Sequence, residues 1–198
     1  MSERLPRLLP ADLTDEQRSL YEVIVGGPRT SGVQLFPIAA PDGSLNGPFG
    51  IMLHVPHLGL PLQDLGVMLR YRTSLSPRER EIAILAVAAT TRSSFELYAH
   101  GLVGQSVGLS EDEVNSLTNG SFSSAAPREE MAFRLCREMV DNPTPSPLTW
   151  DQAAAHFHPP EILELVTVAG YYRTISQMME ICGVSVELPV AEVSPPGR

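Results

Sequence analysis

Three polar residues near the middle of the chain fall on one face of a predicted helix. Ser93, Glu96 and His100 are spaced i, i+3 and i+7, and a helix brings such positions together. A carboxylate four residues before a histidine can orient the imidazole ring and raise its pKa, which suits the histidine to moving protons. A solvent-exposed Glu96–His100 pair that contributes roughly a few tenths of a kcal/mol is the alternative interpretation.

Glu81 is the second candidate for acid–base chemistry. It stands at the head of the apolar run 82–89 (IAILAVAA), which is typical of a helix buried among others. Partial desolvation there would raise the pKa of the Glu81 carboxyl group, as a general base requires. A structural role is equally open, because a carboxylate near a helix N-terminus complements the helix dipole, here with Arg78 or Arg80 as a partner.

Two arginines precede this helix and are candidates to hold a substrate carboxylate. The guanidinium groups of Arg70 and Arg72 could each bind a carboxylate through two parallel hydrogen bonds, and surface solvation is the alternative for each. The other histidines lack the spacing of metal ligands, so we expect no metal site. These four histidines are His54, His57, His156 and His158.

The composition narrows the classes of function. All 14 cationic side chains are arginine, which excludes Schiff-base and P-loop lysine chemistry. The net charge of -9 has the wrong sign for a nucleic-acid partner. Two cysteines, Cys136 and Cys182, are too few for a disulfide framework or a cysteine-built zinc site. No apolar stretch reaches the about 18–20 residues that span a bilayer, so we expect a soluble, cytoplasmic protein without a membrane partner.

Helices must position these side chains, because helix start and stop signals dominate the sequence. Thr14–Gln17, Ser76–Glu79 and Ser110–Glu113 are capping boxes, and no segment shows the sustained alternation of a strand. The sequence therefore predicts an all-α bundle. Its helices are expected near 12–25, 57–72, 77–91, 94–107, 110–117, 128–141, 149–156 and 160–182.

Residues 28–48 are rich in glycine and proline and are predicted to form an ordered loop. Its apolar anchors would be Val33, Leu35, Phe36 and Ile38. A loop of this length in a compact domain is usually functional, and a simple covering loop is the alternative. We expect three parts: an N-terminal helix and covering loop (1–44), a helical domain (45–186) and a flexible tail (187–198).

The order of these motifs resembles the carboxymuconolactone decarboxylase and alkylhydroperoxidase D superfamily. The resemblance spans residues 45–186. It implies an alkylhydroperoxidase D-like helical bundle whose subunits form trimers or hexamers, with active sites near subunit contacts. Apolar surface on the predicted helices around 62–69 and 161–179 also favours a homo-oligomer. The motifs are LSPREREIAILAV at 75–87, FELYAH at 95–100, GLSEDEV at 108–114 and EILELVTVAGYY at 161–172.

The peroxidase branch of this superfamily uses a Cys-x-x-Cys pair. A histidine follows four residues after its second cysteine, and a glutamate lies twelve residues before its first. Aligned on His100, the glutamate matches Glu81, but Ser93 and Glu96 stand where the cysteines would be. Thiol-dependent peroxide reduction needs a thiolate and a resolving thiol, so we expect that activity to be absent. The chain resembles the decarboxylase-like branch instead, through Glu96, His100 and residues 108–113.

The resemblance implies a cofactor-independent acid–base enzyme acting on a small cyclic lactone, carboxylate, or aromatic or polyketide metabolite. Decarboxylation, isomerisation, dehydration and cyclisation would each move a proton beside a carbonyl group. His100 would protonate the carbanion-like carbon, Glu81 would serve as shuttle or base, and Glu96 would orient the imidazole. A non-catalytic oligomeric protein that binds a small ligand is the alternative. The residues expected to bind substrate are Asn46, Arg70, Arg72, Ser93 and Tyr98.

Overall fold

The computed structural model describes residues 4–30, 33–142, 144–184 and 186. This part of the chain is all-α, as predicted, and its only β-structure is an isolated bridge between Ala39 and Leu45. The tail predicted at 187–198 lies outside the described residues. The helices are α1 (Asp15–Val25), α2 (Pro48–Leu53), α3 (Pro56–Tyr71), α4 (Pro77–Thr91), α5 (Ser94–Ser106), α6 (Glu111–Asn119), α7 (Pro127–Asp141), α8 (Pro147–His156) and α9 (Pro159–Cys182), with short 3-10 helices η1 (Pro10–Asp12) and η2 (Pro28–Thr30).

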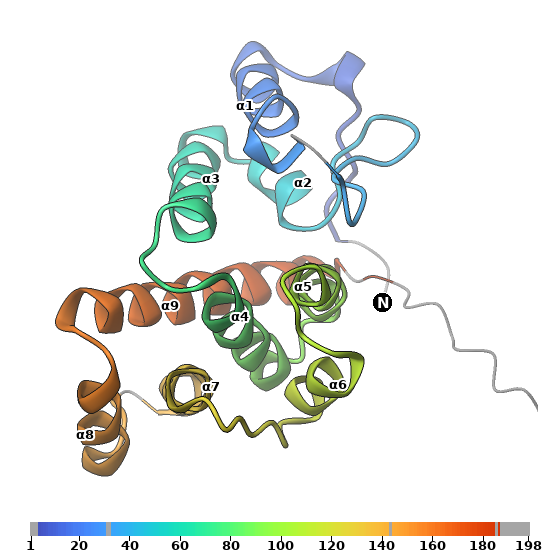
Figure 1. The fold of residues 1–198 in the computed structure, drawn as a ribbon. Coiled ribbons are helices and arrows are strands. Elements are labelled where there is room, and N and C mark those ends of the chain that lie inside the picture. Colours follow the sequence, from blue (N-terminus) through green and yellow to red (C-terminus); the bar gives the residue numbers. More distant parts are fainter. Residues whose placement is uncertain (1–3, 31–32, 143, 185, 187–198) are drawn as a thin grey trace, which may run out of the picture.

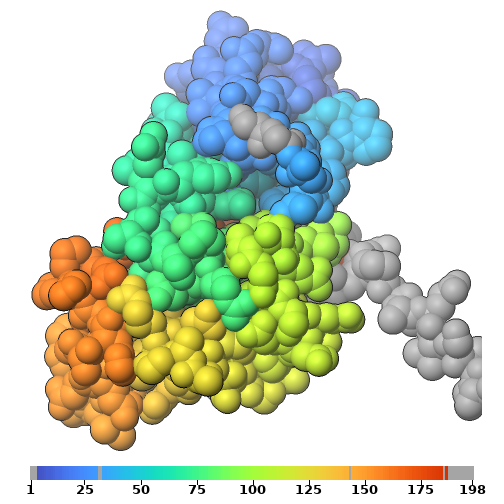
Figure 2. Space-filling model, in the orientation of Figure 1, coloured from blue at the N-terminus to red at the C-terminus, as the bar shows by residue number. Residues whose placement is uncertain are grey.

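The long helix α9 crosses the middle of the molecule and separates two groups of helices (Figure 1). Helices α1, α2 and α3 lie on one side of α9, whereas α4, α6, α7 and α8 lie on the other. The space-filling view in Figure 2 shows the N-terminal residues, in blue, as a layer at the top of the broader body formed by the later helices. The end of α5 comes close to α9, where the two groups of helices meet.

Helix α4 is the centre of the larger group. Ser76 and Glu79 close its N-terminus as the predicted capping box, and Pro77 occupies the first turn. Its middle is apolar on every face, and residues 82–88 are all buried. Such a helix is stable only when other helices surround it, and α4 packs against α5, α6, α7 and α9. The capped end therefore fixes where Glu81 enters the protein interior.

The N-terminal segment shares its core with the rest of the described chain. Leu20 and Ile24 of α1 belong to the same buried apolar cluster as Ile82 and Leu85 of α4. The boundary predicted between residues 44 and 45 thus runs through continuous packing, and the division into two parts stays a prediction.

Only two of the four predicted apolar anchors hold the 28–48 loop against the protein. Phe36 packs edge-on against Phe95 with 6.0 Å between ring centroids, and Ile38 is 4% exposed. The predicted anchors Val33 and Leu35 are wrong, because they are 88% and 38% exposed. The segment bends at residues 35, 36 and 38, so side chains close together in the sequence have different surroundings.

Helix α2 is a short element that begins directly after this loop. Gly47 precedes it with φ of +60°, and a Cβ atom at Gly47 would lie 2.3 Å from the ring of Phe95. Only glycine has neither the strain nor the clash at this position, so Gly47 sets how closely α2 approaches α5. Among the described residues, no helix combines the length and apolar character needed to cross a membrane.

Candidate active site

Glu81 of α4 and His100 of α5 form a buried pair. The Nδ1 atom of His100 lies 2.6 Å from Oε2 of Glu81, and the two residues are 4% and 1% exposed. The chain reverses between α4 and α5 at Arg92, whose φ is +55° in the left-handed region, and α5 then packs back along α4. Two different helices therefore bring Glu81 and His100 together and fix the geometry of the pair.

The second ring nitrogen of His100 faces another carboxylate. Its Nε2 atom lies 3.3 Å from Oε2 of Glu96, one helical turn earlier on α5. Tyr172 of α9 contacts the imidazole edge-on, with 5.1 Å between ring centroids. The interpretation of Glu96 and His100 as a solvent-exposed pair is wrong, because both side chains are buried. The imidazole ring is held between two carboxylates and one aromatic ring.

Opposite charges set the protonation of this cluster. Burial alone would lower the pKa of His100, but the charge and hydrogen bond of Glu81, with a contribution from Glu96, raise it above its usual value. Burial alone would raise the pKa of Glu81, but His100, Arg70 and Arg80 lower it. The expectation of a raised Glu81 pKa is thus wrong, because its cationic partners outweigh desolvation. Both shifts favour the form of the pair in which a protonated imidazole is bonded to a carboxylate.

Glu96 and His100 line a small cavity between α5, α9 and the N-terminal layer. Its volume is about 20 Å³, which is room for about one water molecule. Arg70 also lines this cavity, whereas Glu81 lies behind His100 and does not. Nε2 of His100 is thus the ring nitrogen that faces a cavity-lining carboxylate. The lining residues are Arg29, Phe36, Pro48, Phe49, Arg70, Phe95, Glu96, Ala99, His100, Tyr171, Tyr172 and Ile175.

Four of the residues expected to bind substrate lie outside this lining. Asn46 bonds to Arg7, with 2.8 Å between the guanidinium and the amide oxygen, and donates to the backbone carbonyl of Pro37. Arg72 is exposed at the end of α3, Tyr98 is half-buried on α5, and Ser93 is the buried N-cap residue of α5. A role for these four in substrate binding stays a prediction.

Sequence reasoning missed most of the residues around His100. The aromatic lining comes from four separate segments, and single aromatic residues carry no signal of the space between helices. Tyr171 and Tyr172 belong to the quoted motif at 161–172, and Phe95 belongs to the motif at 95–100, but neither motif indicates a cavity. Arg29 lies in η2, outside every motif, and its position depends on packing against distant helices.

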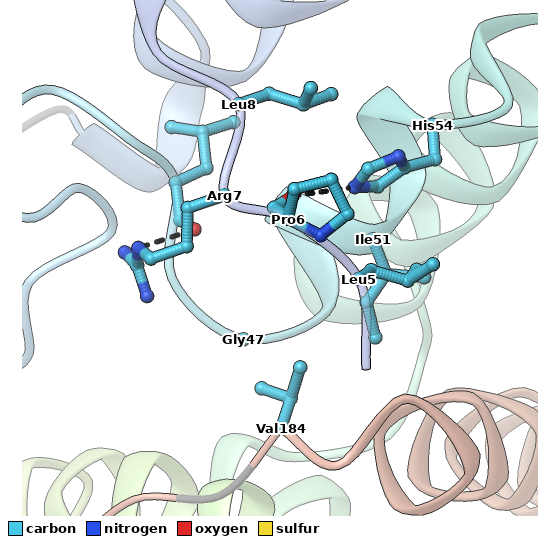
Figure 3. Close-up of a pocket in the computed structure, with 10 residues that line it drawn as sticks. Leu5, Pro6, Arg7, Leu8, Gly47, Ile51, His54 and Val184 are labelled. Carbon is cyan, nitrogen blue, oxygen red and sulfur yellow. Dashed lines mark hydrogen bonds between the residues drawn. The ribbon is translucent and has the colours of Figure 1, made fainter. Parts of the chain in front are cut away.

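A second cavity, shown in Figure 3, provides an internal comparison. Its volume is about 30 Å³ and it lies between the N-terminal segment and α2. Here His54 lies with Nε2 3.1 Å from the backbone carbonyl oxygen of Pro6 (Figure 3). Arg7 donates hydrogen bonds to the side chains of Ser44 and Asn46. These polar side chains hold the N-terminal segment in place. No carboxylate lines this cavity, so its histidine lacks the acidic partners of His100.

The two cysteines of this chain lie away from Ser93 and Glu96, which stand where the peroxidase branch has its Cys-x-x-Cys pair. Both are free thiols, and Cys136 on α7 is fully buried, donating to the carbonyl of Leu165. Burial raises the pKa of the Cys136 thiol to about 12. Cys182 is half-buried at the end of α9. Within the described ranges, no group of three or more His, Cys, Asp or Glu side chains is arranged to hold a metal ion.

Comparisons with known proteins agree on the fold. Residues 62–138, which include Glu81, Glu96 and His100, match the model of the carboxymuconolactone decarboxylase family. A solved structure described as an alkylhydroperoxidase AhpD core, an uncharacterized peroxidase-related protein from Ralstonia eutropha JMP134, is 14% identical, with a TM-score of 0.73 over 96% of this chain and 93% of that one. A peroxidase-related protein from Silicibacter sp. TM1040 is 15% identical, with a TM-score of 0.69 over the same shares. Curated protein sequences give no match.

Proposed function

Since the chain belongs to the carboxymuconolactone decarboxylase and alkylhydroperoxidase D-like superfamily, we propose that it is a cofactor-independent acid–base enzyme acting beside a carbonyl group of a small organic molecule. One observation carries the proposal. The imidazole of His100 lies 2.6 Å from Glu81 and 3.3 Å from Glu96 at the wall of a cavity. A buried, charge-coupled histidine facing a cavity is the arrangement that proton transfer needs.

The cluster suggests a direction for the proton. Glu81 holds the ring through Nδ1 on the interior side, which fixes the orientation of His100 and favours its protonated form. Nε2 faces the cavity-lining carboxylate of Glu96, so it is the ring nitrogen that would deliver a proton to substrate. Glu96 could accept a proton from the substrate or pass one to the ring. The proposed roles are thus His100 as general acid, Glu81 as the orienting carboxylate and Glu96 as the relay.

The resemblance suggests a reaction in which negative charge develops on a carbon conjugated to a carbonyl group. In a decarboxylation, the bond between that carbon and the carboxylate breaks, carbon dioxide leaves, and the electron pair enters the conjugated carbonyl as an enolate. His100 would protonate the carbon and recover its proton from solvent. In an isomerisation, Glu96 would remove a proton and His100 would return one at another position. Both reactions use the same three side chains.

A thiol route is less well supported than the acid–base route. The two structural relatives are titled peroxidase-related, so peroxide reduction is a competing function. In this chain it would have to use Cys136 or Cys182. The thiol of Cys136 is buried with its pKa raised to about 12, which disfavours the thiolate that attacks peroxide.

The non-catalytic alternative draws on one observation. A cavity of about 20 Å³ is too small for a lactone unless side chains move, so the buried cluster could serve binding or structure alone. Proton transfer distinguishes the two, because a binding protein would not exchange substrate protons in a manner that depends on His100.

The test follows proton exchange on an unsaturated lactone carboxylate in deuterated buffer by proton NMR. Wild type should accelerate deuterium incorporation, or loss of the carboxylate, beside the carbonyl group. His100→Gln can still donate to Glu81 but cannot act as an acid, and it should lower the rate about 10²–10⁴-fold. His54→Gln is the matched control, because His54 lies in the other cavity. Equal rates for wild type and His100→Gln would refute the proposal.

We also propose that the protein is a homo-oligomer. Apolar side chains are exposed along α3 and α9, including Leu58 (49%), Met68 (54%) and Leu163 (66%). An apolar groove of about 240 Å³ also lies between these helices and α2. Surfaces of this kind are usually covered by another subunit. Light scattering that gives the monomer mass of 21.5 kDa at every concentration would contradict it. The cytoplasmic location expected from the sequence likewise stays a prediction.

A further inference from the structure

Two arginines reach the cavity at His100 without a carboxylate partner. Arg29 of η2 and Arg70 of α3 both line it, and neither has an ion pair within the described part of the chain. By contrast, Arg78 and Arg128 each bridge two glutamates at the surface of α4. Carboxylates are plentiful in this acidic chain, so the lack of partners at the cavity is a local feature.

The guanidinium group of Arg29 is held by stacking on an aromatic ring rather than by hydrogen bonds. Its guanidinium carbon lies 5.3 Å from the centroid of the Phe49 ring, a cation–π distance. Its Nε atom is buried and has no hydrogen-bond partner. A buried guanidinium nitrogen without an acceptor is costly, and a ligand oxygen could supply that acceptor.

Gly66 of α3 makes room for this arrangement. A Cβ atom at Gly66 would lie 2.6 Å from Nη2 of Arg29 and 2.4 Å from the hydroxyl oxygen of Tyr171. Any other residue would push the guanidinium or the tyrosine away. Arg70 lies one turn further along α3, so the same helix brings the second guanidinium to the cavity.

The charges around the cavity leave a positive excess. The two carboxylates, Glu81 and Glu96, face three guanidinium groups: those of Arg29 and Arg70, and that of Arg80, whose Nε lies 3.8 Å from Oε1 of Glu81. Arginine is charged at any ordinary pH, so this excess does not depend on the protonation of His100. An anionic ligand would balance it.

We propose that Arg29, together with Arg70, binds the carboxylate of a small organic acid and presents its carbonyl group to His100. The inference rests on the proposed function for the role of His100, but not for the binding itself. The planar fork of a guanidinium matches a carboxylate through two parallel hydrogen bonds. This assignment makes the substrate a carboxylic acid rather than a neutral lactone or quinone.

The bound carboxylate is one that the reaction retains. A carboxylate that leaves as carbon dioxide loses its charge in the transition state, so two arginines would hold the starting material more tightly than the transition state and slow the reaction. A retained carboxylate makes equal contacts in both states and serves to position the substrate. The carbon that exchanges its proton with His100 therefore belongs to another part of the molecule.

Binding is measured by NMR titration at pH 7 with benzoate and acetate, each against its neutral amide. Wild type should bind at least one carboxylate about tenfold or more tightly than its amide. Arg29→Met should remove this preference, and Arg18→Met, which deletes an exposed arginine of α1 outside the cavity, should keep it. Gly66→Ala retains the charge of Arg29 but occupies its place, so it should also weaken carboxylate binding.

The outcomes separate this inference from the proposed function. If wild type binds neither carboxylate above its amide, or if Arg29→Met and Gly66→Ala both bind as wild type does, the inference is overturned even where exchange depends on His100. If binding depends on Arg29 but no exchange depends on His100, the carboxylate site stands and the proposed function fails. Should Arg29→Met fail to fold, Gly66→Ala decides.

Discussion

Two glutamates of α4, only two residues apart, have opposite surroundings. Glu79 bonds to Arg128 through both oxygens, at 2.6 and 3.2 Å, and also accepts from the backbone amide of Ser76. Glu81 has one oxygen 2.6 Å from His100 and the other without a hydrogen bond. Glu79 closes the helix end and ties it to α7, whereas Glu81 points into the core toward α5.

The difference separates a structural charge from one suited to chemistry. The partner of Glu79 is an arginine, which does not change its charge at ordinary pH, and every oxygen of Glu79 is satisfied. The partner of Glu81 is a histidine, which does change its charge and lines a cavity, and one oxygen of Glu81 has no hydrogen bond. The first arrangement supports folding, and the second can exchange protons. The predictions below test this contrast.

The largest effect on the rate of proton exchange is expected from His100→Gln, and Glu79→Gln is its comparison. The first change should lower the rate of proton exchange about 10²–10⁴-fold with the fold retained, because glutamine can bond to Glu81 but cannot deliver a proton. The second should leave the rate per folded molecule unchanged. Exchange by NMR and folding by circular dichroism measure both. A similar loss of rate in the two variants would remove the contrast.

Removal of the Arg128 side chain should lower the stability of the protein without lowering the rate of proton exchange. Arg128 bonds to Glu79 and Glu161 and stacks on Phe157, with 4.2 Å to the ring centroid. Arg128→Met should lower the free energy of unfolding by about 1–2 kcal/mol, since the side chain is one-third exposed and partly screened. Urea denaturation gives this value. An unchanged midpoint would show that the surface network does not stabilise the protein.

The pH dependence of stability should originate from His100. Its pKa is raised above 6.5 in the folded state, so its contribution is complete below about pH 6.5 and is lost as pH rises through the folded-state pKa. The pKa of Glu81 is lowered below 4.5, so its contribution is present above pH 4.5 and is lost at lower pH. Urea unfolding at pH 5 to 9 should show stability falling on the alkaline side in wild type and Arg128→Met.

His100→Gln supplies the control for this pH series. The alkaline loss should shrink in this variant, because glutamine does not titrate. An alkaline limb as steep as that of wild type would place its origin in another group.

The smallest effect is expected from the thiols. Replacing both cysteines, as Cys136→Ala with Cys182→Ala, should leave proton exchange within about twofold of wild type. Neither residue lines the cavity at His100. Exchange is compared at equal concentrations of folded protein, since the core loses a buried sulfur atom at position 136. Loss of proton exchange in this double variant would instead support a mechanism that uses a thiol.

Much of the fold followed from local signals. Capping boxes at Thr14, Ser76 and Ser110 and the apolar run at 82–89 set helix positions that the structure matches within a few residues. These signals depend on neighbouring residues alone, so a sequence contains them directly. The loop anchors Val33 and Leu35 failed because burial of an irregular segment depends on distant packing.

The site divides in the same way. The pairing of Glu81 with His100 was predictable from family spacing, and the i, i+4 spacing of Glu96 and His100 was visible in the sequence. The lowering of the Glu81 pKa was not predictable, because it depends on cationic side chains from several elements. Arg29 reaches the cavity only through the gap at Gly66, and no local pattern signals that approach.

The most direct test of the buried proton pair is an NMR titration of His100 itself, which needs no substrate. Protein with isotope-labelled histidine is titrated from pH 4 to 10, and His100→Gln identifies its signals. The account predicts that His100 titrates above 6.5 with both ring nitrogens protonated at neutral pH, and that Glu81→Gln lowers this pKa. A His100 that is neutral at pH 7 and indifferent to Glu81→Gln would contradict it.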